Sequence, residues 1–207
     1  MIKNLLTDQS AAEQNVLDND YHECLEFEKV SFDNLVLENH TFEDCRFISC
    51  SFAHISLKEA SFISCEFDAC SLTLCDMKFA TLNGVVFRNC RLIGLNYTEC
   101  NSFGFSPEYY DCVLDTNMFF ENNLSKCAFE GCTLKNTDFI NCNLKEASFR
   151  KSTFDAVLFE KANLEKTIFL EARDYRIDPF GNKLKGAKFD LPEAQSFLGY
   201  LGIKLEQ

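Results

Sequence analysis

The segment "CRFISCSFAHISLKEASFISCEFDACSLTLCDMKF", residues 45–79, repeats one pattern every five residues. A Phe or Leu occupies the third place of each group of five, and Met77 is the one exception. A small or apolar residue, often Cys, lies two positions before the large one, and such residues point to the same side of an extended segment. Because period five fits neither a helix nor a continuous strand, the pattern predicts short extended segments separated by corners, with both columns facing inward.

The same pattern covers most of the chain. It runs from Phe27 to Tyr97 and, in a new phase, from Leu114 to Phe169. Inward residues spaced by twenty positions are often of the same type, which indicates four groups of five in each coil. The clearest column of this kind contains Phe27, Phe47, Phe67 and Phe87.

Individual groups resemble the motif A(D/N)LXX of the pentapeptide repeat family, in which the central Leu or Phe is innermost. The groups "CRFIS", "CEFDA", "CTLKN", "CNLKE" and "ANLEK" carry this resemblance, which covers roughly residues 25–171. The resemblance implies an all-β solenoid, a right-handed quadrilateral β-helix with four pentapeptides per coil. We therefore expect an N-terminal cap over 1–24, repeat blocks over 25–99 and 112–171, and a C-terminal helix and tail over 172–207.

The interruption between the two blocks allows two interpretations. From Tyr97 to Leu114 is seventeen residues, which equals one repeat plus twelve residues or three irregular repeats plus two. We favour a projecting loop over 100–111, because Gly104 and Pro107 are typical of turns. Aromatic residues on such a loop are typical partner contacts, although they could instead fold back onto the coil. The expected contact residues are Phe103, Phe105, Pro107, Tyr109 and Tyr110.

The chain is acidic, with a formal net charge of −12 and a pI of about 4.7. This charge argues against binding to nucleic acid, which needs clustered Lys and Arg. It permits either simple solubility or a surface that competes with nucleic acid for a basic groove on a partner. Lysines interrupt the acidic positions, so no single stripe is evident. The candidate acidic surface consists of Glu28, Asp33, Glu38, Glu43, Asp155, Glu160 and Glu165.

Twelve cysteines and three histidines raise the question of metal binding or catalysis. Eleven of the cysteines fall in the small inward column or its continuation at Cys100, where a thiol packs as a small apolar group. His40 also falls in that column, whereas His22 and His54 look isolated. The sequence contains no phosphate-binding loop, nucleophile elbow or helical His pair. We expect no catalytic residues, no metal and no cofactor.

The C-terminal segment "DLPEAQSFLGYLGIKLE" predicts a helix that begins after Asp190, with Pro192 in its first turn. The longer segment from Asp174 resembles the C-terminus of Qnr-type and albicidin-resistance-type pentapeptide repeat proteins, which protect type II topoisomerases. That resemblance implies DNA gyrase or topoisomerase IV as the partner and a homodimer joined through the C-termini. The expected dimer contacts are Leu191, Phe197, Leu198 and Leu201.

The sequence thus predicts a non-enzymatic DNA mimic that protects a bacterial topoisomerase from a quinolone or a natural-product antibiotic. The alternative is an interaction scaffold for another protein. The first residues lack the apolar segment of a signal peptide and no apolar run could cross a bilayer, so a cytoplasmic location without membrane contact is expected.

Overall fold

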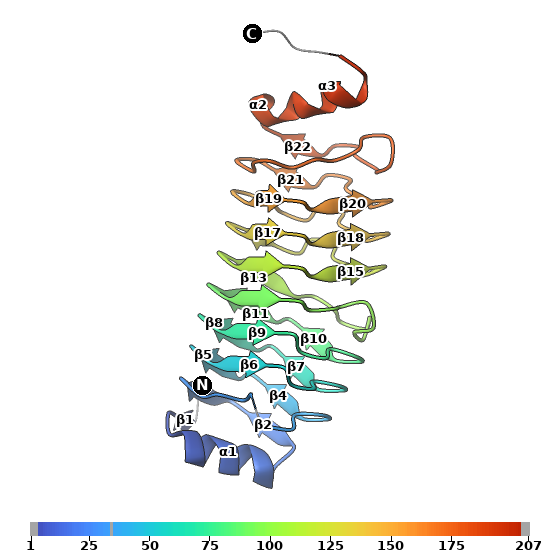
Figure 1. Ribbon diagram of the computed structural model, residues 1–207. Helices are drawn as coiled ribbons and strands as arrows, with labels where there is room; N and C mark the ends of the chain where they lie inside the picture. The colour runs from blue at the N-terminus through green and yellow to red at the C-terminus, as the bar shows by residue number, and fades with distance from the viewer. Residues whose placement is uncertain (1–3, 34, 204–207) are drawn as a thin grey trace.

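The computed structural model describes residues 4–33 and 35–203 and shows a rod of stacked coils, about nine turns in all (Figure 1). Each coil passes through four short walls, named A, B, C and D here in chain order. Neighbouring coils pair through parallel strands, and Phe47 lies opposite Phe27 and Phe67, one coil away on either side. The predicted all-β solenoid with four five-residue groups per coil is confirmed.

The strands of walls B, C and D form one sheet each, whereas those of wall A form two, the smaller of which consists of its last two strands; the bounds below are given in chain order. Wall A contains β1 (Asn4–Leu6), β3 (Leu25–Glu28), β5 (Arg46–Ile48), β8 (Glu66–Asp68), β11 (Val86–Arg88), β13 (Glu108–Tyr110), β16 (Phe129–Glu130), β21 (Ile168–Phe169) and β22 (Lys188–Phe189). Wall B contains β6 (Ser51–Ala53), β9 (Ser71–Thr73), β12 (Arg91–Ile93), β14 (Val113–Asp115), β17 (Thr133–Lys135) and β19 (Thr153–Asp155). Wall C contains β15 (Met118–Phe120), β18 (Asp138–Ile140) and β20 (Leu158–Glu160). Wall D contains β2 (Tyr21–Glu23), β4 (Thr41–Glu43), β7 (Ser61–Ile63) and β10 (Thr81–Asn83).

The large residues of the repeat fill the interior in straight columns. On wall A nine aromatic rings lie one above the next, with neighbouring centroids 4.6 to 5.3 Å apart. Stacked pairs of this kind contribute about 0.5–1.5 kcal/mol each beyond the burial of their area. The rings are Phe27, Phe47, Phe67, Phe87, Tyr109, Phe129, Phe149, Phe169 and Phe189.

The N-terminal end of the rod is covered by α1 (Gln9–Asp18). The Asp8 side chain caps the helix by accepting a hydrogen bond from Ala11 N at 2.9 Å, as expected of an N-cap aspartate. The Gln9 side chain exchanges two hydrogen bonds with the backbone of Ser31, at 2.6 and 2.8 Å. The helix is thereby fixed over the first coil, although its presence was not predicted.

The predicted projecting loop over 100–111 is wrong. Residues 108–110 form β13, which pairs with β11 so that Tyr109 lies opposite Phe87. Phe105 bridges to Asn83 and its side chain is 7% exposed, so it occupies the interior at wall D. The segment therefore contains three irregular repeats plus two extra residues, which was the other interpretation of the count.

The physical reason for this outcome is the column of rings on wall A. Tyr109 supplies the ring between Phe87 and Phe129, with centroid distances of 5.3 and 4.8 Å. A twelve-residue loop would instead have exposed Tyr109, whose side chain is 0% exposed in the structure. The two extra residues are absorbed on wall D, where Phe103 at the tip is 85% exposed. We call residues 101–106 the bulge.

The corners of the coil use a backbone conformation that the inward pattern does not reveal. The fifth residue of many groups has a positive φ, for example 58° at Lys29 and 51° at Leu74. This conformation is unfavourable for residues other than Gly by about 1–2 kcal/mol. Hydrogen bonds to the next coil hold it, such as that from Leu74 N to Ile93 O at 2.8 Å.

The two blocks on either side of the bulge differ in which corner of the coil is closed by a backbone hydrogen bond. In the first block it closes the corner between walls C and D, as from Ala60 N to Leu57 O at 3.1 Å. In the second block it closes the corner between walls D and A, as from Ala147 N to Leu144 O at 3.0 Å. The two blocks therefore differ in corner geometry as well as in phase.

The stack extends further toward the C-terminus than the repeat pattern predicts. A last, irregular coil continues to Phe189, whose ring stacks on Phe169 at 5.0 Å. Two short helices follow, α2 (Leu191–Ala194) and α3 (Ser196–Tyr200). Asp190 is the N-cap residue of α2 as predicted, but its side chain accepts a hydrogen bond from Glu171 N and makes no bond to its own helix.

Candidate partner-binding surfaces

The five predicted contact residues of the interruption do not form one exposed surface. Phe105, Pro107 and Tyr109 are buried, and Tyr110 is half-buried. The Tyr110 hydroxyl donates to Glu108 Oε2 at 2.7 Å, and its ring lies 4.5 Å from the Arg88 guanidinium. Of the five, Phe103 alone has a largely exposed side chain. The segment's other aromatic side chains are buried or half-buried.

The seven predicted acidic residues surround the rod at two levels. Glu28, Asp33, Glu38 and Glu43 follow one another around walls A to D of an N-terminal coil. We call these four residues the N-terminal acidic ring. Successive members of the ring are five residues apart, so each carboxylate lies on the next wall of the coil. For this reason they form no stripe along one face. Asp155, Glu160 and Glu165 occupy the same place in their groups on walls B, C and D near the other end, and we call them the C-terminal acidic band.

Two members of the N-terminal acidic ring also have structural roles. Asp33 Oδ1 accepts hydrogen bonds from Ser51 Oγ at 2.7 Å and Ala53 N at 2.8 Å. Glu43 accepts from the Tyr21 hydroxyl at 2.8 Å, and this bond is the main cause that raises the Tyr21 pKa to about 12. These two carboxylates are therefore engaged within the protein, and Glu28 is also paired with Lys29 at 3.0 Å.

The charge of the rod is strongly polarised along its length. Residues 1–50 contain eleven acidic and three basic residues, a net charge of −8 out of −12. The second block, residues 112–171, contains nine acidic and seven basic residues, a net charge of −2. The N-terminal coils thus carry most of the negative charge, and the second block is close to neutral.

Wall A contains a line of ion pairs that sequence reasoning missed. Arg46 lies between Glu26 and Glu66, at 3.1 Å from each, and Arg88 lies 3.2 Å from Glu66. The line continues through Tyr110, over which Arg88 lies. The spacing of twenty between opposite charges was the available signal. Because its charges are mutually compensated, this part of wall A is a poor surface for a basic partner.

The C-terminal apolar residues divide between the core and the surface. Phe197 packs against Phe189 with centroids 4.9 Å apart, and Leu198 is half-buried. Leu191 and Leu201 are 80% and 59% exposed. The C-terminal region therefore exposes several apolar side chains, among them also Phe180, Tyr200 and Ile203.

The twelve cysteines are free and buried. Burial raises the pKa of Cys75, Cys100 and Cys127 to about 12, so their thiols stay protonated. Cys75 Sγ donates to Phe52 O at 3.2 Å, a contact that recurs along the column. In that state these three thiols are neither nucleophiles nor metal ligands.

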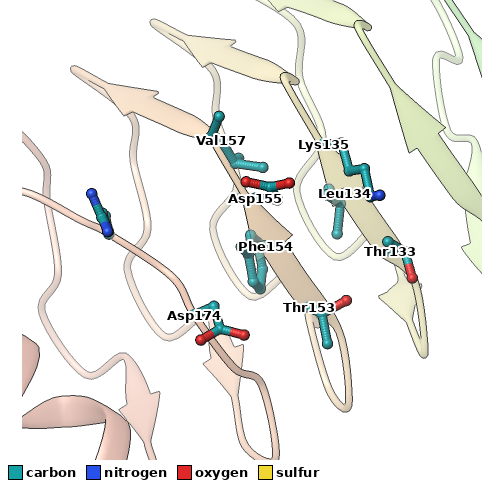
Figure 2. Close-up of a pocket in the computed structure, with 10 residues that line it drawn as sticks. Thr133, Leu134, Lys135, Thr153, Phe154, Asp155, Val157 and Asp174 are labelled. Atoms are coloured by element: carbon teal, nitrogen blue, oxygen red, sulfur yellow. The ribbon is translucent and has the colours of Figure 1, made fainter.

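A surface depression of about 540 Å³ lies near the end of wall B (Figure 2). Figure 2 shows Thr133 and Thr153 on adjacent strands, with Lys135, Asp155 and Asp174 nearby. Its charges have both signs, and the acids are exposed. Within residues 4–33 and 35–203, no three His, Cys, Asp or Glu side chains are grouped to hold a metal ion.

The helices of the described chain are too short or too polar to cross a membrane.

The five-residue period, the filled interior and the parallel walls together define a pentapeptide repeat solenoid. A family profile described as "Pentapeptide repeat region" matches residues 40–103 and 105–173, which is more than half of the chain. The chain belongs to the pentapeptide repeat family.

Solved structures with the same fold include two informative relatives. One is QnrB1, described as a plasmid-mediated fluoroquinolone resistance protein, with 21% identity over 90% of each chain and a TM-score of 0.59. Another is HetL from the cyanobacterium Nostoc sp. strain PCC 7120, described as involved in heterocyst differentiation regulation. It is 16% identical over 88% of this chain and 92% of its own, with a TM-score of 0.54. No curated protein sequence matches the chain significantly.

Proposed function

We propose that this protein binds a bacterial type II topoisomerase, DNA gyrase or topoisomerase IV, and protects it from a poison such as a quinolone. It acts as a binding protein, without catalysis or a cofactor. The observation that carries this proposal is the concentration of negative charge on the N-terminal coils of a regular rod. Such a surface can compete with duplex DNA for a basic groove of the enzyme, because both present repeated negative charge.

In this proposal the two blocks have different roles, which follow from their different charges. The N-terminal acidic ring and its neighbours are the part of the rod that resembles DNA in charge. The second block, with a net charge of only −2 over 112–171, is less suited to that role. In each chain the N-terminal end would therefore be the part that mimics DNA.

A homodimer through the C-termini fits this division. Leu191 and Leu201 are exposed apolar residues at the end opposite the N-terminal acidic ring. Joining two chains there would bury these residues and place an acidic end at each extremity of a longer rod. Phe103 lies between the two blocks and would contact the enzyme directly.

A supercoiling assay with purified gyrase tests the proposal. Supercoiling inhibited by a quinolone should recover as the protein is added, and a pull-down should show the complex. Absence of binding and of recovery at every ratio, for gyrase and topoisomerase IV alike, would reject it.

An interaction scaffold for another protein is the second candidate, and the exposed apolar residues favour it. Leu74, Phe79 and Phe103 are 52%, 54% and 85% exposed along the first block and the bulge. Binding through such residues persists in high salt, whereas binding through the acidic ring weakens as salt screens the charges. The salt dependence of complex formation separates the two candidates.

A further inference from the structure

Wall C of the second block has a largely apolar outer face. Its strands β15, β18 and β20 form one sheet and lie one above another along the rod (Figure 1). Side chains alternate along a strand, so the residues on either side of each inward ring face outward. Five of these outward residues, which we call the wall C face, are Met118, Phe120, Asp138, Ile140 and Leu158. The Met118 and Leu158 side chains are each 42% exposed, whereas Phe120 and Ile140 are half-buried beside them.

The fold does not require apolar residues at the places of Met118 and Leu158. The corresponding places on wall D hold Asn123, Asn143 and Asn163. Their side chains hydrogen bond from one coil to the next at 2.9 and 3.1 Å. The motif A(D/N)LXX also has Asp or Asn at this place. Because exposed apolar side chains gathered on one regular face are typical of a protein-binding surface, the wall C face is a candidate for one.

Asp138 places a negative charge at the centre of the wall C face. It lies opposite Met118 on one neighbouring strand and opposite Leu158 on the other. Its side chain is half-buried and can still be reached from solvent. Burial raises the pKa of Asp138, and within residues 4–33 and 35–203 its carboxylate forms no ion pair.

This carboxylate restricts what can cover the wall C face. A partner that packed on both Met118 and Leu158 would also cover Asp138, which lies between them. A carboxylate that is removed from water without a counter-charge is strongly unfavourable. The partner must therefore bring a positive charge to Asp138 as well as apolar side chains to its two neighbours.

The other charges near the wall C face exclude a second copy of this chain as a good occupant. Glu121 and Glu160 are exposed at its edge, and Lys161 is paired with Glu160 at 3.5 Å. Together with Asp138 these are three acidic residues and one basic residue, a net charge of −2. Two copies packed through this face would bring like charges together, which opposes association.

The spacing of the column fits an α-helix that lies along the rod. Neighbouring strands are about 4.8 Å apart, so Met118 and Leu158 are separated by roughly 10 Å with Asp138 midway. Positions i, i+4 and i+7 lie on one side of a helix, and a rise of about 1.5 Å per residue places the last two roughly 6 and 10.5 Å from the first. A helix with apolar residues at i and i+7 and a basic residue between them therefore matches the column.

We propose that the wall C face binds an amphipathic helix of a partner protein, in which an arginine or lysine lies between two apolar residues on the same side. The apolar residues pack on Met118 and Leu158, and the basic residue pairs with Asp138. The aliphatic part of the basic side chain adds to the apolar contact. This inference does not rest on the topoisomerase proposal, because the wall C face lies outside the N-terminal acidic ring and uses a different kind of contact.

Three synthetic peptides test the proposal by ¹H–¹⁵N NMR titration of the full-length protein. The first is an Ala- and Gln-based helix of about 16 residues, long enough to be helical, with Leu, Arg and Leu at positions i, i+4 and i+7. It should shift the resonances of residues 118–120, 138–140 and 158–160 in a saturable manner. The second has Gln in place of the Arg, and the third has the Arg on the opposite side of the helix.

The second and third peptides should each bind at least roughly fivefold more weakly than the first, because neither forms the charge-assisted bond to Asp138. The third peptide keeps the net charge of the first, so it controls for general attraction to an acidic protein. Equal binding of all three peptides, no binding of the first, or shifts confined to the N-terminal acidic ring would overturn the proposal.

Substitutions in the protein localise the effect. Asp138→Asn should weaken binding of the first peptide at least roughly fivefold and leave the affinity for the second within about twofold, because the second brings no charge to this point. Asp111→Asn is the matched control, since Asp111 is an exposed carboxylate at the corner between walls A and B, and it should change neither affinity. Equal effects of these two substitutions would contradict the site.

A double variant tests the apolar part of the wall C face. Met118→Asn with Leu158→Asn gives wall C the residue type that wall D carries at these places, and it should abolish the saturable shifts. Unchanged binding in a folded double variant would show that these two side chains are not contacts. Asp138→Asn keeps the test decisive if the double variant does not fold.

Discussion

At the scale of single residues, Tyr109 is the side chain that joins the two halves of the rod. Its ring continues the wall A column, but its hydroxyl is buried and has no hydrogen-bond partner among the described residues. Burial, and then the neighbouring Tyr97 hydroxyl, raise the pKa of Tyr109 well above the usual range, so the hydroxyl stays protonated. Tyr97, on wall C, has a buried hydroxyl in the same condition.

We predict opposite outcomes for two substitutions at Tyr109. Tyr109→Ala should lower the free energy of unfolding by about 3–5 kcal/mol, because it empties one place in the ring column. Tyr109→Phe should leave it unchanged or raise it by about 1 kcal/mol, because it removes a buried hydroxyl without a partner. Chemical denaturation measures both, with Phe103→Ala as an exposed control. A clear loss of stability in Tyr109→Phe would contradict the structure at this point.

His22 gives the N-terminal end a dependence on pH. The ring is 2% exposed and stacked on Phe42, and its Nε2 lies 3.2 Å from His40 Nδ1. Burial, and then the neighbouring His40, lower the pKa of His22 to about 4, although Asp20 opposes this shift. Burial also lowers the pKa of His40. The two imidazoles, which looked unrelated in the sequence, thus form a neutral pair.

The native state therefore loses stability as the pH falls. Below pH 6.5 the unfolded chain binds protons that the folded His22 does not, so stability is full above pH 6.5 and declines toward pH 4. Between pH 7.5 and 5 the loss from His22 should be about 2 kcal/mol. Thermal unfolding at several pH values measures it, and His22→Phe should reduce the slope. An equal slope in both proteins would show that His22 is not responsible.

At the scale of elements, the bulge contains two residues more than a regular repeat would place on wall D. Replacing residues 101–106, "NSFGFS", with "TLNG" from residues 81–84 would give wall D a regular group at this coil. We predict that this variant folds with a free energy of unfolding within about 1 kcal/mol of the wild type, because strand pairing on both sides is kept. Circular dichroism with denaturation measures it. A large loss of stability would mean that the bulge itself organises the change of corner.

Much of this element-level structure follows from the sequence, and the exceptions have physical causes. The columns from Phe27 to Tyr97 were predictable because each inward place has one steric requirement. The placement of Tyr109 was not, since seventeen residues fit two solutions and only the stacking on Phe87 and Phe129 separates them. The ion pairs of Arg46 with Glu26 and Glu66 depend on which coils are adjacent. These contacts lie twenty or more residues apart and have no local pattern.

At the scale of the whole molecule, the two ends of the rod have different surfaces. The N-terminal end is acidic, whereas the C-terminal end exposes Leu191 and Leu201. An apolar end surface of this kind is typical of a protein interface. The proposed assembly is therefore a dimer with its acidic ends outward.

We predict that the double variant Leu191→Glu with Leu201→Glu is monomeric at concentrations where the wild type is dimeric. Two carboxylates brought against their copies would oppose association by charge repulsion and desolvation. Analytical ultracentrifugation measures the mass, and circular dichroism checks that the coils remain folded. The surface residue Lys126, remote from this end, provides a control as Lys126→Glu. A wild type that is monomeric at all concentrations would reject the dimer.

The N-terminal acidic ring is the proposed surface for binding a topoisomerase. The most direct measurement compares the dissociation constants of two matched triple variants for purified gyrase. One neutralises Glu28, Glu38 and Glu43 as glutamines, and the other neutralises Asp155, Glu160 and Glu165 of the C-terminal acidic band as Asn, Gln and Gln. We predict that the first weakens binding about tenfold at low salt and the second about twofold or less, because steering and complementarity depend on local charge. Equal effects of the two variants, or a wild type that does not bind gyrase, would contradict the account.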